Sequence, residues 1–204
     1  RVFLATIHSF CFNLLKMEGV AFEVLTGKDQ IRFIRDVIKH LKCKDLAIGM
    51  VLREISLAKN NLIMVSEFRD LYMGDKTMLK VADVFELYDR RKSSKMLMDF
   101  DDLLVGAYQL LKSDDTVRQK YREIFRHLLV DEFQDSNPIQ FELMKLLLPS
   151  GNGNDSSFWI CGDDWQSIYG FTGATIENIL NFSADHPGSK QFILDINYRS
   201  TPQI

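Results

Sequence analysis

Two short apolar segments, each followed at once by polar side chains, constrain the fold of this chain more than any other feature. Residues 127–131 read His-Leu-Leu-Val-Asp and residues 157–161 read Ser-Phe-Trp-Ile-Cys, with a helical segment at 138–148 between them. Short continuous apolar runs are typical of buried strands, and a helix between two such strands is typical of a parallel crossover. The sequence therefore predicts an α/β fold built on a buried parallel sheet.

The rest of the chain extends this pattern and interrupts it once. Residues 1–5 predict a core strand that leads through Thr6, a helix cap, into a helix, while residues 174–182 predict a helix and residues 191–195 a further strand. Between residues 29 and 111, by contrast, apolar side chains recur every three or four positions with little alternation, which indicates helices alone. We therefore expect a partial parallel sheet with flanking helices, interrupted by an all-helical insertion.

This pattern divides the chain into two parts. Residues 1–20 and 96–204 together form the expected α/β domain, and residues 21–95 form the expected helical insertion. A chain of 204 residues of which 46% are hydrophobic can bury a substantial core. We expect an ordered protein rather than a disordered one.

Composition excludes several classes of protein. A net charge of −3 gives no overall attraction to nucleic acid, so phosphate binding requires local basic groups. Cys11, Cys43 and Cys161 lie far apart in no metal-binding spacing, which argues against a zinc site and a disulfide framework and favours the reducing cytoplasm. No apolar run reaches the roughly 18 residues that a membrane span needs.

Three carboxylates crowd the turn that follows the segment 127–131. Asp131 and Glu132 end the predicted strand, and Asp135 follows three residues later. An acidic side chain at a strand end can hold Mg²⁺ against nucleotide phosphates while its neighbour polarises the attacking water, which assigns Asp131 to the metal and Glu132 to water. Helix capping before residue 138 explains Asp135 better, but it explains little of Asp131 and Glu132. A metal-dependent nuclease built from all three carboxylates is an alternative.

Polar clusters also follow the other two predicted strands. Residues 162–170 read Gly-Asp-Asp-Trp-Gln-Ser-Ile-Tyr-Gly and contain Gln166, whose amide could bind a γ-phosphate. Residues 197–201 read Asn-Tyr-Arg-Ser-Thr and contain Arg199, a side chain suited to bidentate phosphate contacts. The alternatives are a polar turn with Trp165 packed as an anchor and an ordinary surface arginine.

Taken together, these strings resemble the UvrD/Rep/PcrA family of superfamily 1 helicases. Five ordered segments carry the resemblance: Thr-Ile-His-Ser-Phe-Cys at 6–11, similar to the family's TFHS-type motif; Asp-Phe-Asp-Asp-Leu-Leu at 99–104, similar to its DFDDL motif; and residues 128–136, 162–169 and 197–200, similar to motifs II, III and IV. The resemblance spans the whole chain, although residues 29–91 share only position and helical character. It implies a RecA-like sheet.

The resemblance implies roles in ATP hydrolysis for four residues. Asp131 would coordinate Mg²⁺ and Glu132 would act as the base. Gln166 would couple the γ-phosphate of ATP to DNA contacts, and Arg199 would stabilise charge that develops in the transition state. ATP and Mg²⁺ are therefore the implied ligands.

The resemblance also implies contacts with single-stranded DNA. Thr6, His8 and Ser9 would touch the DNA backbone, and Tyr169 and Phe171 would stack on bases. The family's RWRGA-type run after the motif III tyrosine is Gly-Phe-Thr-Gly-Ala here, and both arginines are missing. This departure removes positive charge at the stacking site.

No GxxxxGK[ST] string, the phosphate-binding Walker A loop, occurs in the sequence. The resemblance implies an ATP-dependent DNA helicase that moves 3′ to 5′. Because the phosphate-binding loop is missing, we expect this chain to be an internal segment of such a protein, inactive by itself and able to self-associate through an exposed sheet edge. Two alternatives stay open. They are a DNA- or partner-binding remnant without ATPase activity, and part of an AddA/RecB-type helicase–nuclease subunit.

Overall fold

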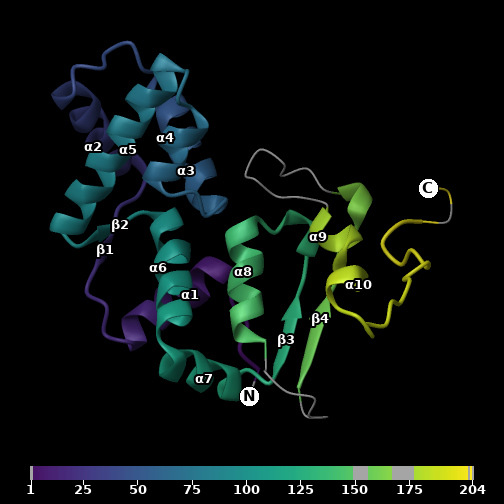
Figure 1. Cartoon of the computed structure of the whole chain (residues 1–204). Coiled ribbons are helices and arrows are strands. Elements are labelled where there is room, and N and C mark those ends of the chain that lie inside the picture. Colours follow the sequence, from purple (N-terminus) through teal and green to yellow (C-terminus); the bar gives the residue numbers. More distant parts are fainter. Residues whose placement is uncertain (1, 149–155, 167–176, 202, 204) are drawn as a thin grey trace.

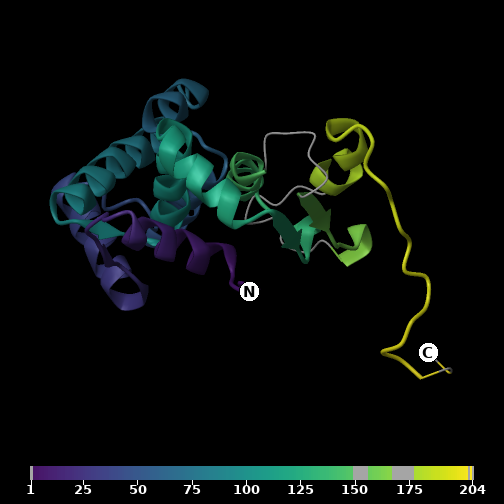
Figure 2. The same cartoon turned by 90° about the horizontal axis from the view of Figure 1, so that it is seen from below.

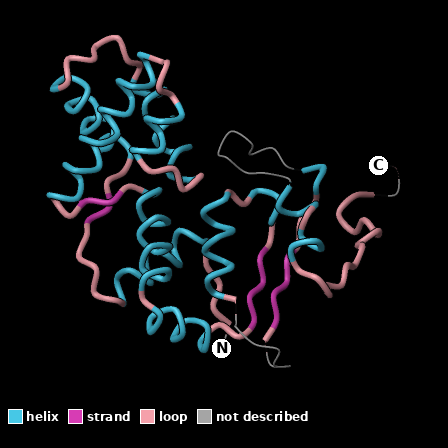
Figure 3. The backbone as a smooth tube through the Cα atoms, in the orientation of Figure 1, coloured by secondary structure: helices cyan, strands magenta, loops and turns pink. Residues whose placement is uncertain are grey.

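The computed structural model describes residues 2–148, 156–166, 177–201 and 203. Figure 1 shows a group of helices joined through a pair of very short strands to a second group of helices, beside which lie two longer strands. Figure 3 separates the helices, strands and loops along the same path. The expected α/β fold, with a partial parallel sheet and flanking helices, is confirmed.

The first group contains helices that surround one apolar core. Its elements are α2 (Gly27–His40), α3 (Ile48–Asn60), α4 (Val65–Leu71) and α5 (Lys76–Ser94). Ile34, Val51 and Val81 are fully buried in this core because apolar positions recur at helical spacing. The helix α5 starts at the cap Asp75, whose carboxylate accepts hydrogen bonds from the amides of Thr77 and Met78.

The second group has a separate core. Its helices are α1 (Ile7–Met17), α6 (Phe100–Ser113), α7 (Asp115–Ile124) and α8 (Pro138–Leu147). Cys11 of α1, Leu104 of α6 and Ile139 of α8 are fully buried there. Burial raises the pKa of the Cys11 thiol to about 12, so this cysteine is a packing residue.

The two groups are joined where the chain enters and leaves the first group of helices. β1 (Glu23–Val24) and β2 (Leu97–Met98) pair in parallel, with Glu23 opposite Leu97. The entering and leaving segments therefore lie side by side, as Figure 1 shows.

A buried ionic cluster strengthens this junction. Lys59 at the end of α3 and Lys92 of α5 meet Asp99 and Asp102 at the start of α6, with 2.6 Å from Lys59 Nζ to Asp102 Oδ1 and 2.5 Å from Lys92 Nζ to Asp99 Oδ2. The hydroxyl of Tyr88 donates to Asp99 as well. Asp99 is also the cap of α6, where it accepts from the Asp102 amide. Residues of the DFDDL string therefore tie α3 and α5 to α6.

The longer strands, β3 (His127–Val130) and β4 (Ser157–Ile160), pair in parallel with Leu128 opposite Phe158. Their expected burial on both faces is wrong. Phe158 packs against Phe182 of α10 (Phe182–Asp185), but Leu129 and Trp159 on the opposite face are 72% and 54% exposed. The reason is that α10 covers one face of this pair, while the described residues leave the other largely open.

Two predicted strands do not form. Residues 2–5 are irregular, with Val2 96% exposed, and residues 191–195 are also irregular, with Leu194 87% exposed. A strand needs a hydrogen-bonding neighbour, and among the described residues β3 and β4 pair only with each other. Phe192 stacks against Trp159 of β4, and Figure 2 shows the end of the C-terminal stretch beyond the sheet.

The helix expected at 174–182 is shorter and divided. It appears as α9 (Glu177–Leu180), followed by α10, while its first three residues lie outside the described part. Within the described residues, no helix is long and apolar enough to cross a membrane.

Candidate functional site

The candidate site begins where β3 ends. Asp131 and Glu132 follow Val130 directly, and both side chains are exposed. Glu132 has φ 50° and ψ 43°, a left-handed conformation that costs a residue with a side chain about 1–3 kcal/mol. The Glu132 amide donates to Asp131 Oδ1 at 3.0 Å. Backbone strain of this kind is common at functional sites, but Lys42, Leu62 and Met96 also have positive φ angles elsewhere in the described chain.

A hydrogen bond from Gln134 fixes the side chain of Glu132. Gln134 lies in the 3₁₀ helix η1 (Phe133–Asp135) and is 1% exposed. Its Nε2 donates to Glu132 Oε2 at 2.7 Å, and its Oε1 accepts from the Asp163 amide at 3.1 Å. The loop after β3 is thereby bonded to the loop after β4.

The loop after β4 contains the 3₁₀ helix η2 (Asp164–Gln166). Asp163 caps it by accepting from the Trp165 amide and, at 2.6 Å, from Gln166 Nε2. Trp165 is 92% exposed, so its interpretation as a packed anchor is wrong. Gln166 lies in this loop as expected. Its side chain donates to Asp163, and the amide of Asp163 donates to Gln134.

The structure describes Arg199, but it does not describe Tyr169 or Phe171. Arg199 is exposed, and its amide donates to Asn197 Oδ1 at 2.9 Å. The structure records no hydrogen bond or ion pair between Arg199 and Asp131 or Glu132, so it does not bring this arginine into the site. Tyr169 and Phe171 lie outside the described residues.

The predicted DNA-contacting residues stand at the start of α1. Thr6 caps this helix as expected, with its Oγ1 accepting from the Ser9 amide at 3.2 Å and donating to Ser9 Oγ at 3.0 Å. Both side chains are exposed, and the first amides of a helix attract phosphate. His8 is half-buried, and this burial lowers the pKa of its imidazole while the carboxylate of Asp101 opposes the shift.

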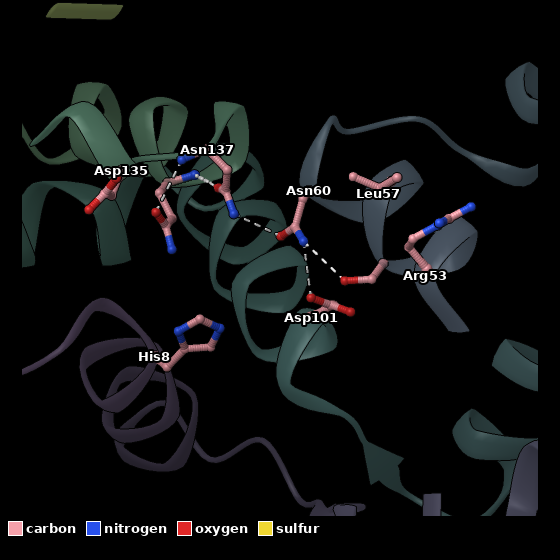
Figure 4. A pocket seen from close by; sticks show the side chains of 9 residues that line it. His8, Arg53, Leu57, Asn60, Asp101, Asp135 and Asn137 are labelled. Atoms are coloured by element: carbon pink, nitrogen blue, oxygen red, sulfur yellow. Dashed lines mark hydrogen bonds between the residues drawn. The ribbon is translucent and has the colours of Figure 1, made fainter. Parts of the chain in front are cut away.

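A cavity of about 380 Å³ lies between the start of α1 and the turn after β3. The sequence analysis did not predict this cavity. Figure 4 shows Asn60 of α3 bonded both to Asn137, the cap of α8, and to Asp101 of α6, with His8 of α1 across the cavity. Asp135 also lines it, with one carboxyl oxygen buried and unbonded. Burial raises the pKa of this carboxyl, and the charge of Glu132 adds to the effect. His8, Asp101 and Asp135 lay in strings that the sequence analysis had singled out, but Asn60 did not, and nothing in the sequence placed these residues around one cavity.

The residues present fit the implied Mg²⁺ site. Mg²⁺ in nucleotide sites is held through one or two carboxylates together with substrate phosphates. Asp131 offers one exposed carboxylate at the strand end, and the described residues contain no cluster of three potential ligands that would form an all-protein cage. Asp131, Glu132 and Asp135 are therefore not assembled into the three-carboxylate centre of the nuclease alternative.

The fold and the site define the class of protein. Carboxylates at the end of a parallel strand, a polar loop after the next strand and helices attached at a DFDDL string agree with the resemblance to superfamily 1 helicases. The family described as "UvrD/REP helicase N-terminal domain" matches residues 1–187. The chain therefore belongs to the UvrD/REP helicase family.

Curated relatives agree with this assignment. The chain is 34% identical over 211 residues to an ATP-dependent DNA helicase PcrA of Staphylococcus epidermidis and 33% identical to one of Staphylococcus aureus. Each match covers 100% of this chain and 28% of the relative. The chain therefore spans about 28% of the length of these relatives.

Proposed function

We propose that this chain works within an ATP-dependent DNA helicase, where it couples ATP hydrolysis to movement along single-stranded DNA in the 3′ to 5′ direction. The observation that carries the proposal is the geometry of Glu132. A carboxylate at a strand end is held in a strained backbone conformation and fixed on one oxygen by Gln134. Such fixing is expected of a side chain that must meet a reacting atom.

Each site residue has a proposed part in hydrolysis. Mg²⁺, held by Asp131, would neutralise charge on the nucleotide phosphates. Glu132 accepts the proton of the attacking water on the oxygen that Gln134 leaves free. Gln166 contacts the γ-phosphate from the loop after β4. Arg199 is assigned to stabilise the charge that develops in the transition state.

DNA binding is proposed at the start of α1. Thr6 and Ser9 present hydroxyls and helix amides to a backbone phosphate, with His8 beside them. Tyr169 and Phe171 are proposed to stack on bases.

The proposed domain division supports this arrangement. Residues 1–20 and 96–204 form the motor part and residues 21–95 the helical insertion. Two separate apolar cores and the pairing of β1 with β2 at the junction support it.

We also propose a cytoplasmic location, which suits the three free cysteines. Self-association through an exposed edge of the β3–β4 sheet is proposed for the chain alone.

ATP hydrolysis tests the proposal. We would assay this chain and a version extended at both ends by the flanking segments of the S. epidermidis relative, each with and without single-stranded DNA. The chain alone should be inactive because it lacks a GxxxxGK[ST] loop. The extended protein should hydrolyse ATP faster with DNA, and Glu132→Gln should abolish turnover.

Other outcomes favour the alternatives. An extended protein that binds DNA without hydrolysing ATP would support the binding remnant. DNA cleavage that needs Mg²⁺ and no ATP would support a nuclease at Asp131, Glu132 and Asp135. Turnover by the chain alone would contradict the predicted need for the phosphate-binding loop.

A further inference from the structure

Gln134 is bonded through its side chain to both the loop after β3 and the loop after β4. We infer that Gln134 is a positioning residue that orients the Glu132 carboxylate only while the loop at 161–166 is in place. The inference deepens the proposed function and rests on it. Gln134 itself touches neither ATP nor DNA.

The orientation of the Gln134 amide is fixed by its surroundings. The side chain is 1% exposed, so an unbonded amide group would carry a desolvation penalty. Nε2 donates to Glu132 Oε2, and Oε1 accepts from the Asp163 amide. A flipped amide would place two acceptors together at Glu132 and two donors together at Asp163. Both bonds are therefore satisfied in one orientation only.

Gly162 allows the loop to approach this closely. A Cβ at position 162 would lie 2.6 Å from Gln134 Oε1 and 2.8 Å from Ile179 Cδ1, closer than real Cβ contacts. The Cys161 amide and carbonyl meanwhile bond to Val130 and Phe133, which extends the β3–β4 pairing beyond the strands. A side chain at position 162 would therefore displace Gln134, Ile179 or both, although the backbone conformation there does not itself call for glycine.

The contacts continue to a residue assigned to the γ-phosphate. Asp163 accepts from Gln166 Nε2 at 2.6 Å, which gives a series of hydrogen bonds from Glu132 through Gln134 and Asp163 to Gln166. A shift of the loop by about 1 Å would lengthen the bond from the Asp163 amide beyond hydrogen-bonding distance. Gln134 would then lose the partner that fixes its amide, and Glu132 would lose its orientation.

Substitution of Gln134 in the extended protein tests this inference. Gln134→Met has similar volume and makes neither bond, and it should lower kcat on the order of tenfold to a hundredfold. KM for ATP should change by less than about threefold, because phosphate binding is left intact. DNA should no longer stimulate turnover. Gln119→Met removes a similar glutamine–glutamate pair from the exposed face of α7 and should leave kcat unchanged.

Gly162→Ala provides a second, independent disturbance of the same contact. The added Cβ should displace Gln134 and lower kcat to a similar degree, and the double variant should be no worse than either single variant. If Gln134→Met fails to fold, Gln134→Glu decides the question. It keeps the size and the acceptor for Asp163 but cannot donate to Glu132, so kcat should still fall.

Failure of the inference is distinguishable from failure of the proposed function. An extended parent that hydrolyses ATP while folded Gln134 variants keep full kcat and DNA stimulation would overturn the inference alone. Additive losses in the double variant would also overturn it. An inert parent would overturn the proposed function and this inference with it.

Discussion

Lys92 of α5 donates to Asp99 at the cap of α6 at 2.5 Å, with the two side chains 2% and 3% exposed. This contact joins α5 to α6, the helix that packs against α8. Burial disfavours ionised Asp99, but Lys59 and Lys92 outweigh that effect and hold the pKa of its carboxyl well below the ordinary range.

Removal of one cation should therefore destabilise the chain strongly. Lys92→Met leaves Asp99 with Lys59 at 3.6 Å as its remaining cation and should lower the free energy of unfolding by about 3–5 kcal/mol. Lys80→Met, on the same helix, breaks an exposed pair with Asp45 and should change it little. Urea denaturation of both variants measures the difference, and equal losses would show that burial does not govern these pairs.

The depressed pKa of Asp99 predicts a dependence on pH. The ionised form is favoured in the folded state, so its stabilisation is present above the unfolded pKa of about 4 and is lost as pH falls through the lower folded value. The gap in unfolding free energy between the wild type and Asp99→Asn should be full near neutral pH and shrink below about pH 4. Denaturation between pH 3 and pH 7 checks this, and a constant gap would contradict it.

The hydrogen bond between Asn60 and Asn137 predicts that loss of Asn60 destabilises the start of α8 beside the cavity. Asn60→Ala leaves the buried Nδ2 of Asn137 without its partner and should cost about 1–3 kcal/mol of unfolding free energy. The neighbouring Asn61→Ala removes only an exposed bond to the Leu57 carbonyl and serves as the control. Hydrogen exchange should quicken at the start of α8 in the Asn60 variant alone. Equal exchange in both variants would exclude the coupling.

Thr6 offers a way to separate helix capping from DNA contact. Thr6→Asp keeps an acceptor for the Ser9 amide and should preserve stability, but its charge should repel a phosphate and weaken binding of single-stranded DNA by the extended protein. Thr6→Ala should lose about 0.5–2 kcal/mol of stability. Fluorescence anisotropy with a labelled oligonucleotide measures the affinity. Unchanged affinity in Thr6→Asp would place the DNA elsewhere.

Local sequence pattern was sufficient for much of the fold. The alternation of short apolar runs with a helix located β3, α8 and β4 within a residue or two, and a threonine before a helical repeat located the cap of α1. These features depend on neighbours in sequence. The placement of Asp131 and Glu132 at a strand end follows from the same pattern.

The features that sequence missed depend on partners far along the chain. Gln134 meets Asp163 across 29 residues, Lys59 meets Asp102 across 43 and Asn60 meets Asn137 across 77. Periodicity contains no information about such pairs. In the sequence, Gln134, Asn60 and Asn137 therefore resemble ordinary polar residues.

The sequence by itself determined where strands and helices would be possible and which polar residues would follow them, because backbone preference and apolar periodicity are local. Only the tertiary structure decided that residues 2–5 and 191–195 remain irregular, that Leu129 and Trp159 are exposed, and that Gln134 holds Glu132. A strand forms only beside another strand, a face is buried only where another element covers it, and an amide is oriented only by the groups around it.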